Sequence, residues 1–213
     1  MTAHRLPAMF LAEAPALDFL NTRAIPVDVD VEWLGSGEDL LAWLQTAKLL
    51  DQDSLDEVRA LATPGELDAV AAQARALREW LRGFVQRHRG KPLARSAEAE
   101  LEPLNGLLAR DRTFTQLVAR SKPDARDGDG GATLQRVLRR HWESADDLLL
   151  PIAQVIADLV TTADFAQVRQ CEGSACVLHF LDTTRGGRRR WCSMSVCGNR
   201  AKQAAHRDRT ASR

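Results

Sequence analysis

The four cysteines of this 213-residue chain lie close together in its C-terminal part, and their spacing suits metal binding. They form two C-x4-C pairs separated by fifteen residues. Each pair can supply one edge of the thiolate tetrahedron that Zn²⁺ prefers, and a site closed by four thiolates has no open position for water. The sequence therefore predicts one structural zinc ion per chain, held by Cys171, Cys176, Cys192 and Cys197.

Two other chemistries fit these cysteines less well. A redox pair would normally be C-x-x-C near a βαβ pattern, and the sequence has neither. Two disulfides would require an oxidising compartment, but the residues after Met1 contain no long apolar run typical of a secretory signal. The most apolar window, 148–160, is too short to span a bilayer. We therefore expect a cytoplasmic protein with reduced thiols and no membrane partner.

A basic segment overlaps the cysteine-rich region. Residues 185–213 carry nine Lys or Arg and one acid, a net charge of +8, whereas residues 1–184 carry −8 and the whole chain is neutral. Such polarity between segments indicates an anionic partner for the basic end, unless the two parts neutralise each other in the fold.

The residues between and after the cysteines predict a small β-hairpin followed by a helix. Residues 177–181 are predicted as one strand, 183–187 as a glycine-containing turn, and 188–191 as the strand that returns to Cys192. Residues 199–207 are mostly good helix formers. Ala201, Ala204 and Ala205 share one helical face, which we expect to pack on the hairpin while a cationic face stays exposed.

These motifs resemble a known family. Cys197-Gly198-Asn199-Arg200, preceded by residues 180–183 and 188–194, resembles the CGNR zinc finger at the C-terminus of bacterial transcription regulators. Residues 16–22 are similar to the short signature that opens ABATE domains. The resemblance implies a DNA-binding zinc finger attached to an N-terminal ABATE domain, with ligand-responsive or stress-related regulation.

The N-terminal part has the apolar periodicity of helices. Residues 67–85 form the longest apolar stripe, in a helix predicted to begin at Thr63 and run to Gly90. Residues 113–118 look like a strand and 121–131 like a loop, after which 132–138 either pair back as a hairpin or form a helix. Further helices are predicted to begin at Ser36, Ser54, Ser96 and Ser144.

The predicted fold is therefore mainly α with a small β component. A helical domain (1–165) precedes a four-cysteine zinc finger (166–213), and the finger is expected to dock on the last helix of that domain because no flexible linker separates them. Asp18 and Asn21 in the N-terminal signature either line a ligand pocket or cap and tie down the N-terminus.

No motif for catalysis accompanies these features. None of the five histidines belongs to a metalloprotease or catalytic-triad signature, and phosphate-cradling glycine motifs are absent. His179 alternates with apolar neighbours and is expected to point outward. We therefore expect a protein that is not an enzyme.

The leading hypothesis is a DNA-binding transcription regulator, with double-stranded DNA as partner. The N-terminal domain would sense a small-molecule effector or mediate homodimerisation, since one finger offers few base contacts. The alternative is a zinc-stabilised module that binds protein or RNA. The predicted nucleic-acid contacts are Arg185, Arg188, Arg189, Arg190, Asn199, Arg200, Lys202, Gln203 and Arg207.

Overall fold

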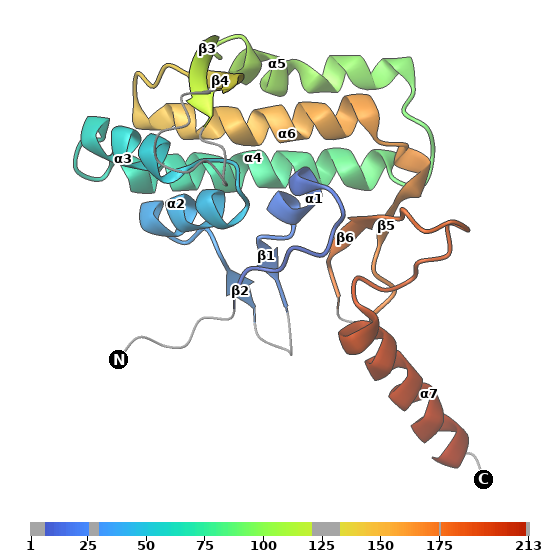
Figure 1. Cartoon of the computed structure of the whole chain (residues 1–213). Coiled ribbons are helices and arrows are strands. Elements are labelled where there is room, and N and C mark those ends of the chain that lie inside the picture. The colour runs from blue at the N-terminus through green and yellow to red at the C-terminus, as the bar shows by residue number, and fades with distance from the viewer. Residues whose placement is uncertain (1–6, 26–29, 121–132, 175, 212–213) are drawn as a thin grey trace, which may run out of the picture.

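The helices of the N-terminal part pack around α4, the longest of them (Glu66–His88). The computed structural model describes residues 7–25, 30–120, 133–174 and 176–211. Helix α6 (Leu149–Thr162) lies along α4, and α5 (Glu102–Leu108) covers the outer side of α6. On the other side of α4 lie α1 (Pro15–Leu20) and α2 (Gly37–Thr46), with α3 (Gln52–Leu61) at one end (Figure 1).

The core of this bundle follows the predicted apolar stripes. Phe84 of α4 makes an edge-on contact with Phe165, their ring centroids 5.9 Å apart, so the end of α4 is packed against the segment that leads into the finger. The side chains with no exposed area include Phe19, Leu41, Leu44, Val70, Leu81, Phe84, Ile152 and Ile156. Within the described residues, no helix is both long and apolar enough to span a bilayer.

Several predicted helices begin or break elsewhere than expected. Ser36 caps α2 as predicted, with Asp39 completing a capping box. However, α3 begins at Gln52, capped by Asp51 instead of Ser54, and α4 begins at Glu66 instead of after Thr63. Gly65, the residue just before α4, has φ +82°, a left-handed conformation that a glycine adopts at no steric cost. The helix therefore begins after Gly65. Glu66 accepts hydrogen bonds from the N–H and the hydroxyl of Thr63, but its own N–H donates to the Thr63 carbonyl instead of the hydroxyl, so only half of a capping box forms there.

The predicted helix from Ser96 to Arg110 is two elements. Residues Arg95–Leu101 form the 3₁₀ helix η2, and α5 follows with Pro103 in its first turn, where the missing proline N–H costs no helical hydrogen bond. Ser144 caps the 3₁₀ turn η3 (Ala145–Leu148) before α6, and Pro151 lies buried in the first turn of that helix.

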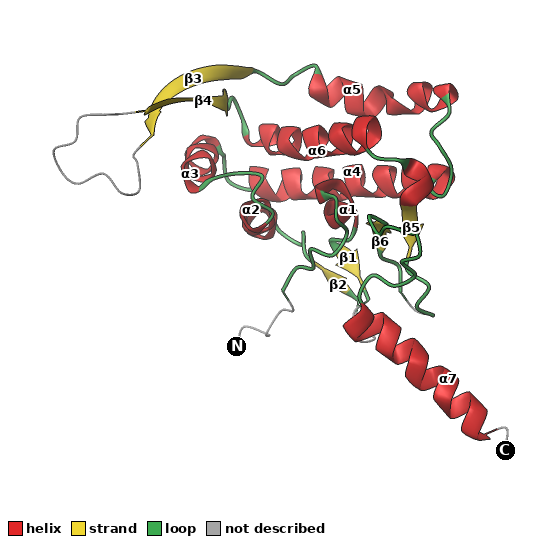
Figure 2. Ribbon diagram, turned by 45° about the vertical axis from the view of Figure 1, so that its right-hand side comes forward, coloured by secondary structure: helices red, strands yellow, loops and turns green. Residues whose placement is uncertain are grey.

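Three small antiparallel hairpins complete the fold. The longest, β3 (Thr113–Arg120) with β4 (Thr133–Arg140), confirms the predicted pairing and extends away from the bundle (Figure 2). The loop predicted at 121–131 lies outside the described residues. Strands β1 (Arg23–Ala24) and β2 (Val31–Glu32) form a short pair next to α1, and β5 (Val168–Gln170) pairs with β6 (His179–Leu181) in the finger.

The partner of the finger strand differs from the prediction. Strand β6 pairs with β5, which precedes the first cysteine, and not with residues 188–191. Asp182 explains why the chain does not return as a strand. Its carboxylate accepts hydrogen bonds from the Thr184 N–H and hydroxyl and from the Arg189 N–H, which closes residues 182–189 into a compact loop.

The finger docks mainly on the N-terminal segment and α1. The Leu181 N–H donates to the Ala12 carbonyl at 2.8 Å, and Asn21 exchanges two hydrogen bonds with the backbone of His179. A short π-helical turn, η5 (Met194–Gly198), carries the last cysteine and leads into α7 (Asn199–Ala211). Helix α7 projects away from the bundle in both views (Figures 1 and 2).

Candidate metal centre and nucleic-acid interface

The fold brings the four cysteine sulfurs into one cluster. All four Sγ atoms lie within 4.8 Å of one another, with Cys192 Sγ 3.5 Å from Cys197 Sγ and 3.8 Å from Cys176 Sγ. A tetrahedron with Zn–S bonds of about 2.3 Å has S–S edges of about 3.8 Å. Cys171, Cys192 and Cys197 are buried and Cys176 is half-buried. The cluster therefore fits a tetrahedral four-thiolate zinc site.

Backbone N–H groups support the thiolates. The Cys192 N–H donates to Cys171 Sγ at 3.3 Å, and the Gly173 N–H also points at that sulfur. Hydrogen bonds from the Cys176 and Cys192 thiols lower the pKa of Cys171 to about 2, and the same sharing raises the pKa of Cys176 to about 12. The two backbone N–H donors remain when a metal replaces the thiol protons, and they stabilise the negative charge that a metal-binding thiolate at Cys171 requires.

Gly173 is a part of this site that the sequence analysis did not single out. A Cβ atom at residue 173 would lie 3.1 Å from Cys176 Cβ and 3.3 Å from Cys197 Sγ. The turn between the first two cysteines can therefore approach the sulfurs closely only with a glycine there. The signal in the sequence is the glycine placed two residues after the first cysteine.

The predicted nucleic-acid contacts fall into two groups, those whose side chains are exposed and those that other residues of the chain engage. Arg185 and Arg188 of the finger loop are exposed, as are Asn199, Arg200, Lys202, Gln203 and Arg207 on α7. Residues 199, 200, 203 and 207 stand at helical positions i, i+1, i+4 and i+8 and share one face. Asn199 also donates to the Ser195 carbonyl at 3.3 Å, bracing the helix start. Helix α7 leads away from β5 and β6 (Figure 2), which differs from the predicted packing of this helix on a hairpin.

Two of the predicted phosphate contacts are engaged within the chain. Arg190 forms an ion pair with Glu172 at 2.6 Å and covers the Trp191 ring. Arg189 is 19% exposed and lies 4.2 Å from the centroid of the Phe180 ring. Its guanidinium donates to the carbonyls of Leu11, Trp191 and Cys192. Arg189 therefore braces the zinc loop against the N-terminal segment, and its guanidinium is already engaged by three carbonyls.

Replacing Arg189 with lysine should lower thermal stability without removing a positive charge. Lysine cannot span three carbonyls with a planar fork, so buried acceptors lose their donors, at about 1–3 kcal/mol. Differential scanning calorimetry of the zinc-loaded protein measures this. The matched control is Arg188→Lys in the same loop, which should melt like the parent; equal melting temperatures for all three proteins would contradict the bracing role.

Asp18 and Asn21 have structural contacts in this structure. Asp18 Oδ1 accepts hydrogen bonds from the N–H groups of Leu11 and Ala12, and Asn21 holds the backbone of His179. Burial raises the pKa of Asp18, and these backbone donors oppose that rise. The contacts match the alternative in which the two residues tie down the N-terminal segment.

His179 is placed differently from its prediction. Its side chain is buried instead of facing outward, because β6 is covered on both faces. Burial lowers the pKa of His179 to about 4, with Arg82 and Arg89 adding to the effect. The imidazole is therefore neutral at neutral pH.

Two family models match the chain. Residues 13–163 match ABATE, described as a putative stress-induced transcription regulator, and residues 167–210 match the CGNR zinc finger. The chain belongs to the ABATE family. No curated protein matches it. The CGNR match contains all four clustered cysteines, so this ABATE protein carries one structural zinc site formed by Cys171, Cys176, Cys192 and Cys197.

Proposed function

We propose that this ABATE protein is a transcription regulator that binds double-stranded DNA through α7 and the adjacent finger loop. The observation that supports it most is α7 itself, a 13-residue helix that extends from the bundle with exposed basic and amide side chains (Figure 1). At 1.5 Å per residue it is about 20 Å long, and an α-helix of this kind fits the major groove.

Each side chain on this surface has a role that its chemistry suits. Arg200, Gln203 and Arg207 share the face that would enter the groove, where arginine pairs with guanine and glutamine with adenine. Arg185 and Arg188 extend from the finger loop and would contact phosphates, which position a protein without reading sequence. The zinc ion holds this loop and the start of α7 together through Cys192 and Cys197, and it has no catalytic part.

The N-terminal domain would regulate this contact. One helix reads few base pairs, so we propose a homodimer or a second partner for useful specificity, and an effector sensed by the helical domain. The alternative partners are structured RNA and acidic protein. The deep, narrow major groove of A-form RNA does not admit side chains, so a helix that reads base edges favours DNA.

Arginine substitutions test the proposal on duplexes enriched from a random DNA library. Arg188→Ala should weaken binding equally on all sequences and reduce the slope of log affinity against log salt by about 0.9, because one phosphate contact is lost. Arg200→Ala should cost about 1–3 kcal/mol on the enriched site and relax preference at one position.

The control is Arg112→Ala, which removes the same charge from an arginine 67% exposed on the helical domain. Its affinity and salt slope should equal those of the parent. If all three variants bind like the parent at every salt concentration, α7 and its loop are not the DNA-binding surface. Enrichment of RNA or an acidic peptide over duplex DNA would favour the alternative.

A further inference from the structure

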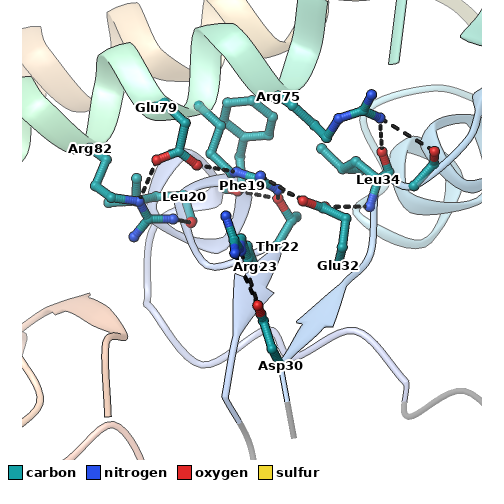
Figure 3. A network of polar contacts seen from close by, with 12 residues as sticks. Phe19, Leu20, Thr22, Arg23, Asp30, Glu32, Leu34, Arg75, Glu79 and Arg82 are labelled. Atoms are coloured by element: carbon teal, nitrogen blue, oxygen red, sulfur yellow. Dashed lines mark hydrogen bonds and ion pairs between the residues drawn. The ribbon is translucent and has the colours of Figure 1, made fainter. Parts of the chain in front are cut away.

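A groove of about 320 Å³ lies where the helical domain meets the finger. One wall is formed by Glu79, Arg82 and Gln86 of α4, and the opposite wall by Gln170, Val177 and His179 of the finger. Pockets for small molecules typically measure about 300–1,000 Å³ and occur preferentially at domain interfaces. Figure 3 shows the α4 side of the groove, with Glu79 and Arg82 above the β1–β2 pair.

His179 is the feature of this groove that its surroundings leave unexplained. Its backbone is fixed by two hydrogen bonds with Asn21, 2.8 and 2.9 Å long. Its side chain is only 1% exposed. The backbone of Val177 interacts with the imidazole, but neither ring nitrogen has a partner at full hydrogen-bond geometry among the described residues. Unpaired polar atoms in buried positions cost free energy, and native structures contain few of them. A neutral imidazole offers one donor and one acceptor to whatever meets it.

The charges that line the groove are already balanced. Arg82 is paired with Glu79 at 3.1 Å, and Arg23 with Asp30 at 3.0 Å, so the two cations face two anions (Figure 3). An ion would gain no net attraction from these pairs. The remaining polar groups, the amides of Gln86 and Gln170, each offer a donor and an acceptor.

Apolar groups complete the lining. Ala24 and Ile25 of the β1 edge and Val177 of the finger also face the groove. An occupant that satisfies the whole lining therefore carries both a hydrogen-bond donor and an acceptor on a flat, apolar frame. Amides and heteroaromatic lactams have this chemistry.

We propose that this groove is a binding site for an uncharged small molecule of the aromatic amide or lactam class, held between α4 and the finger with His179 as its polar contact. Such a molecule touches both family-matched segments at once and would bias how the finger sits on the helical domain. Its role as an effector of DNA binding rests on the proposed function, whereas its binding does not.

Benzamide and benzoate form a matched pair of probes, since they share shape and differ in charge. Each is titrated to millimolar concentration into the full-length, zinc-loaded protein, with the imidazole resonances of all five histidines followed by NMR. Benzamide should shift the His179 resonances saturably, while benzoate should leave them unchanged. No saturable shift with either probe means that the groove holds only water and overturns the proposal; a shift with benzoate alone overturns the uncharged class.

Substitutions on both walls locate the binding. His179→Leu and Gln86→Ala should each weaken benzamide binding about tenfold, the equivalent of one good hydrogen bond. Gln86 is exposed on α4, so its replacement keeps the fold even if a change at His179 does not. His141→Leu, at an exposed histidine beside the β3–β4 hairpin, should bind like the parent. Unchanged benzamide affinity in the Gln86 variant would overturn the site.

The effector role has a separate readout. Saturating benzamide should change the affinity of the parent protein for its enriched duplex, and should not do so in Gln86→Ala. An unchanged affinity overturns the effector role while the binding site stands. A parent protein that binds no duplex overturns the proposed function and leaves the benzamide result unaffected.

Discussion

Cys192→Ser should abolish tight zinc binding and unfold the finger, the largest effect expected from any single substitution in this chain. Cys192 Sγ lies next to two other cysteine sulfurs, and the backbone N–H of this residue supports a third. Structural zinc contributes about 10–16 kcal/mol to folding in finger peptides, which is more than the whole stability of most small modules. A serine hydroxyl is a far poorer zinc ligand than a thiolate.

The helical domain should remain folded but melt at a lower temperature. Its core helices α4 and α6 have their own apolar contacts. Ala12 and Asn21, however, lose their hydrogen bonds to the backbone of the finger. Metal analysis together with circular dichroism on heating measures both effects. Ser195→Ala, an exposed neighbour, is the control. Full zinc content with the parent's melting curve in Cys192→Ser would refute the four-cysteine site.

The zinc ligands could be predicted from the sequence because residue type and spacing carry the chemistry. Four cysteines in two C-x4-C pairs leave few alternatives to a tetrahedral metal site. The inward orientation of the Arg189 side chain could not be predicted in this way. Its neighbours Arg188 and Arg190 have the same charge and propensity, and only the Leu11 and Cys192 carbonyls, 178 and 3 residues away, select Arg189 as the brace.

His179 shows a second limit of sequence patterns. Alternation along a strand identifies a buried and an exposed face only when one face meets solvent. Here α1 and the N-terminal segment pack against β6. The alternation of residues along β6 therefore predicts an exposed position for His179 that the fold does not provide. The first residues of helices were harder to predict than their positions. Asp51 precedes α3 in place of the predicted Ser54, and Gly65 precedes α4 in place of Thr63.

Arg78 marks a third limit, because it occupies a core position in the apolar stripe of α4. Residues 71, 74, 78, 81 and 85 follow helical spacing, and all five are buried. An apolar pattern does not include residue 78, because arginine is charged. The two Glu32 oxygens accept from the Arg78 guanidinium at 2.7 Å each, and Thr22 and Glu79 accept its other N–H groups.

Arg78→Met should therefore destabilise the protein by about 3–5 kcal/mol at neutral pH. Methionine fills much of the same volume, but Glu32 keeps its negative charge in a half-buried position after losing both hydrogen bonds from Arg78. Urea denaturation monitored by circular dichroism gives the free energy of unfolding. The control is Arg59→Met, which breaks an exposed ion pair with Glu38 and should cost no more than about 1 kcal/mol.

The pH dependence separates a lost ion pair from a simple packing defect. In the parent, burial raises the pKa of Glu32, but the hydrogen bonds from Arg78 and the Leu34 N–H outweigh it and hold that pKa below its usual value. The parent's stabilisation by Glu32 is therefore present above the unfolded-state pKa and is lost as the pH falls.

In Arg78→Met the hydrogen bonds from arginine are gone, so burial raises the pKa of Glu32. Protonation of Glu32 then relieves the cost of its buried charge. The difference in unfolding free energy between parent and variant should shrink as the pH falls through the ordinary pKa of a glutamate, about 4.3. A difference that stays constant as the pH falls would mean that Arg78 acts through packing alone.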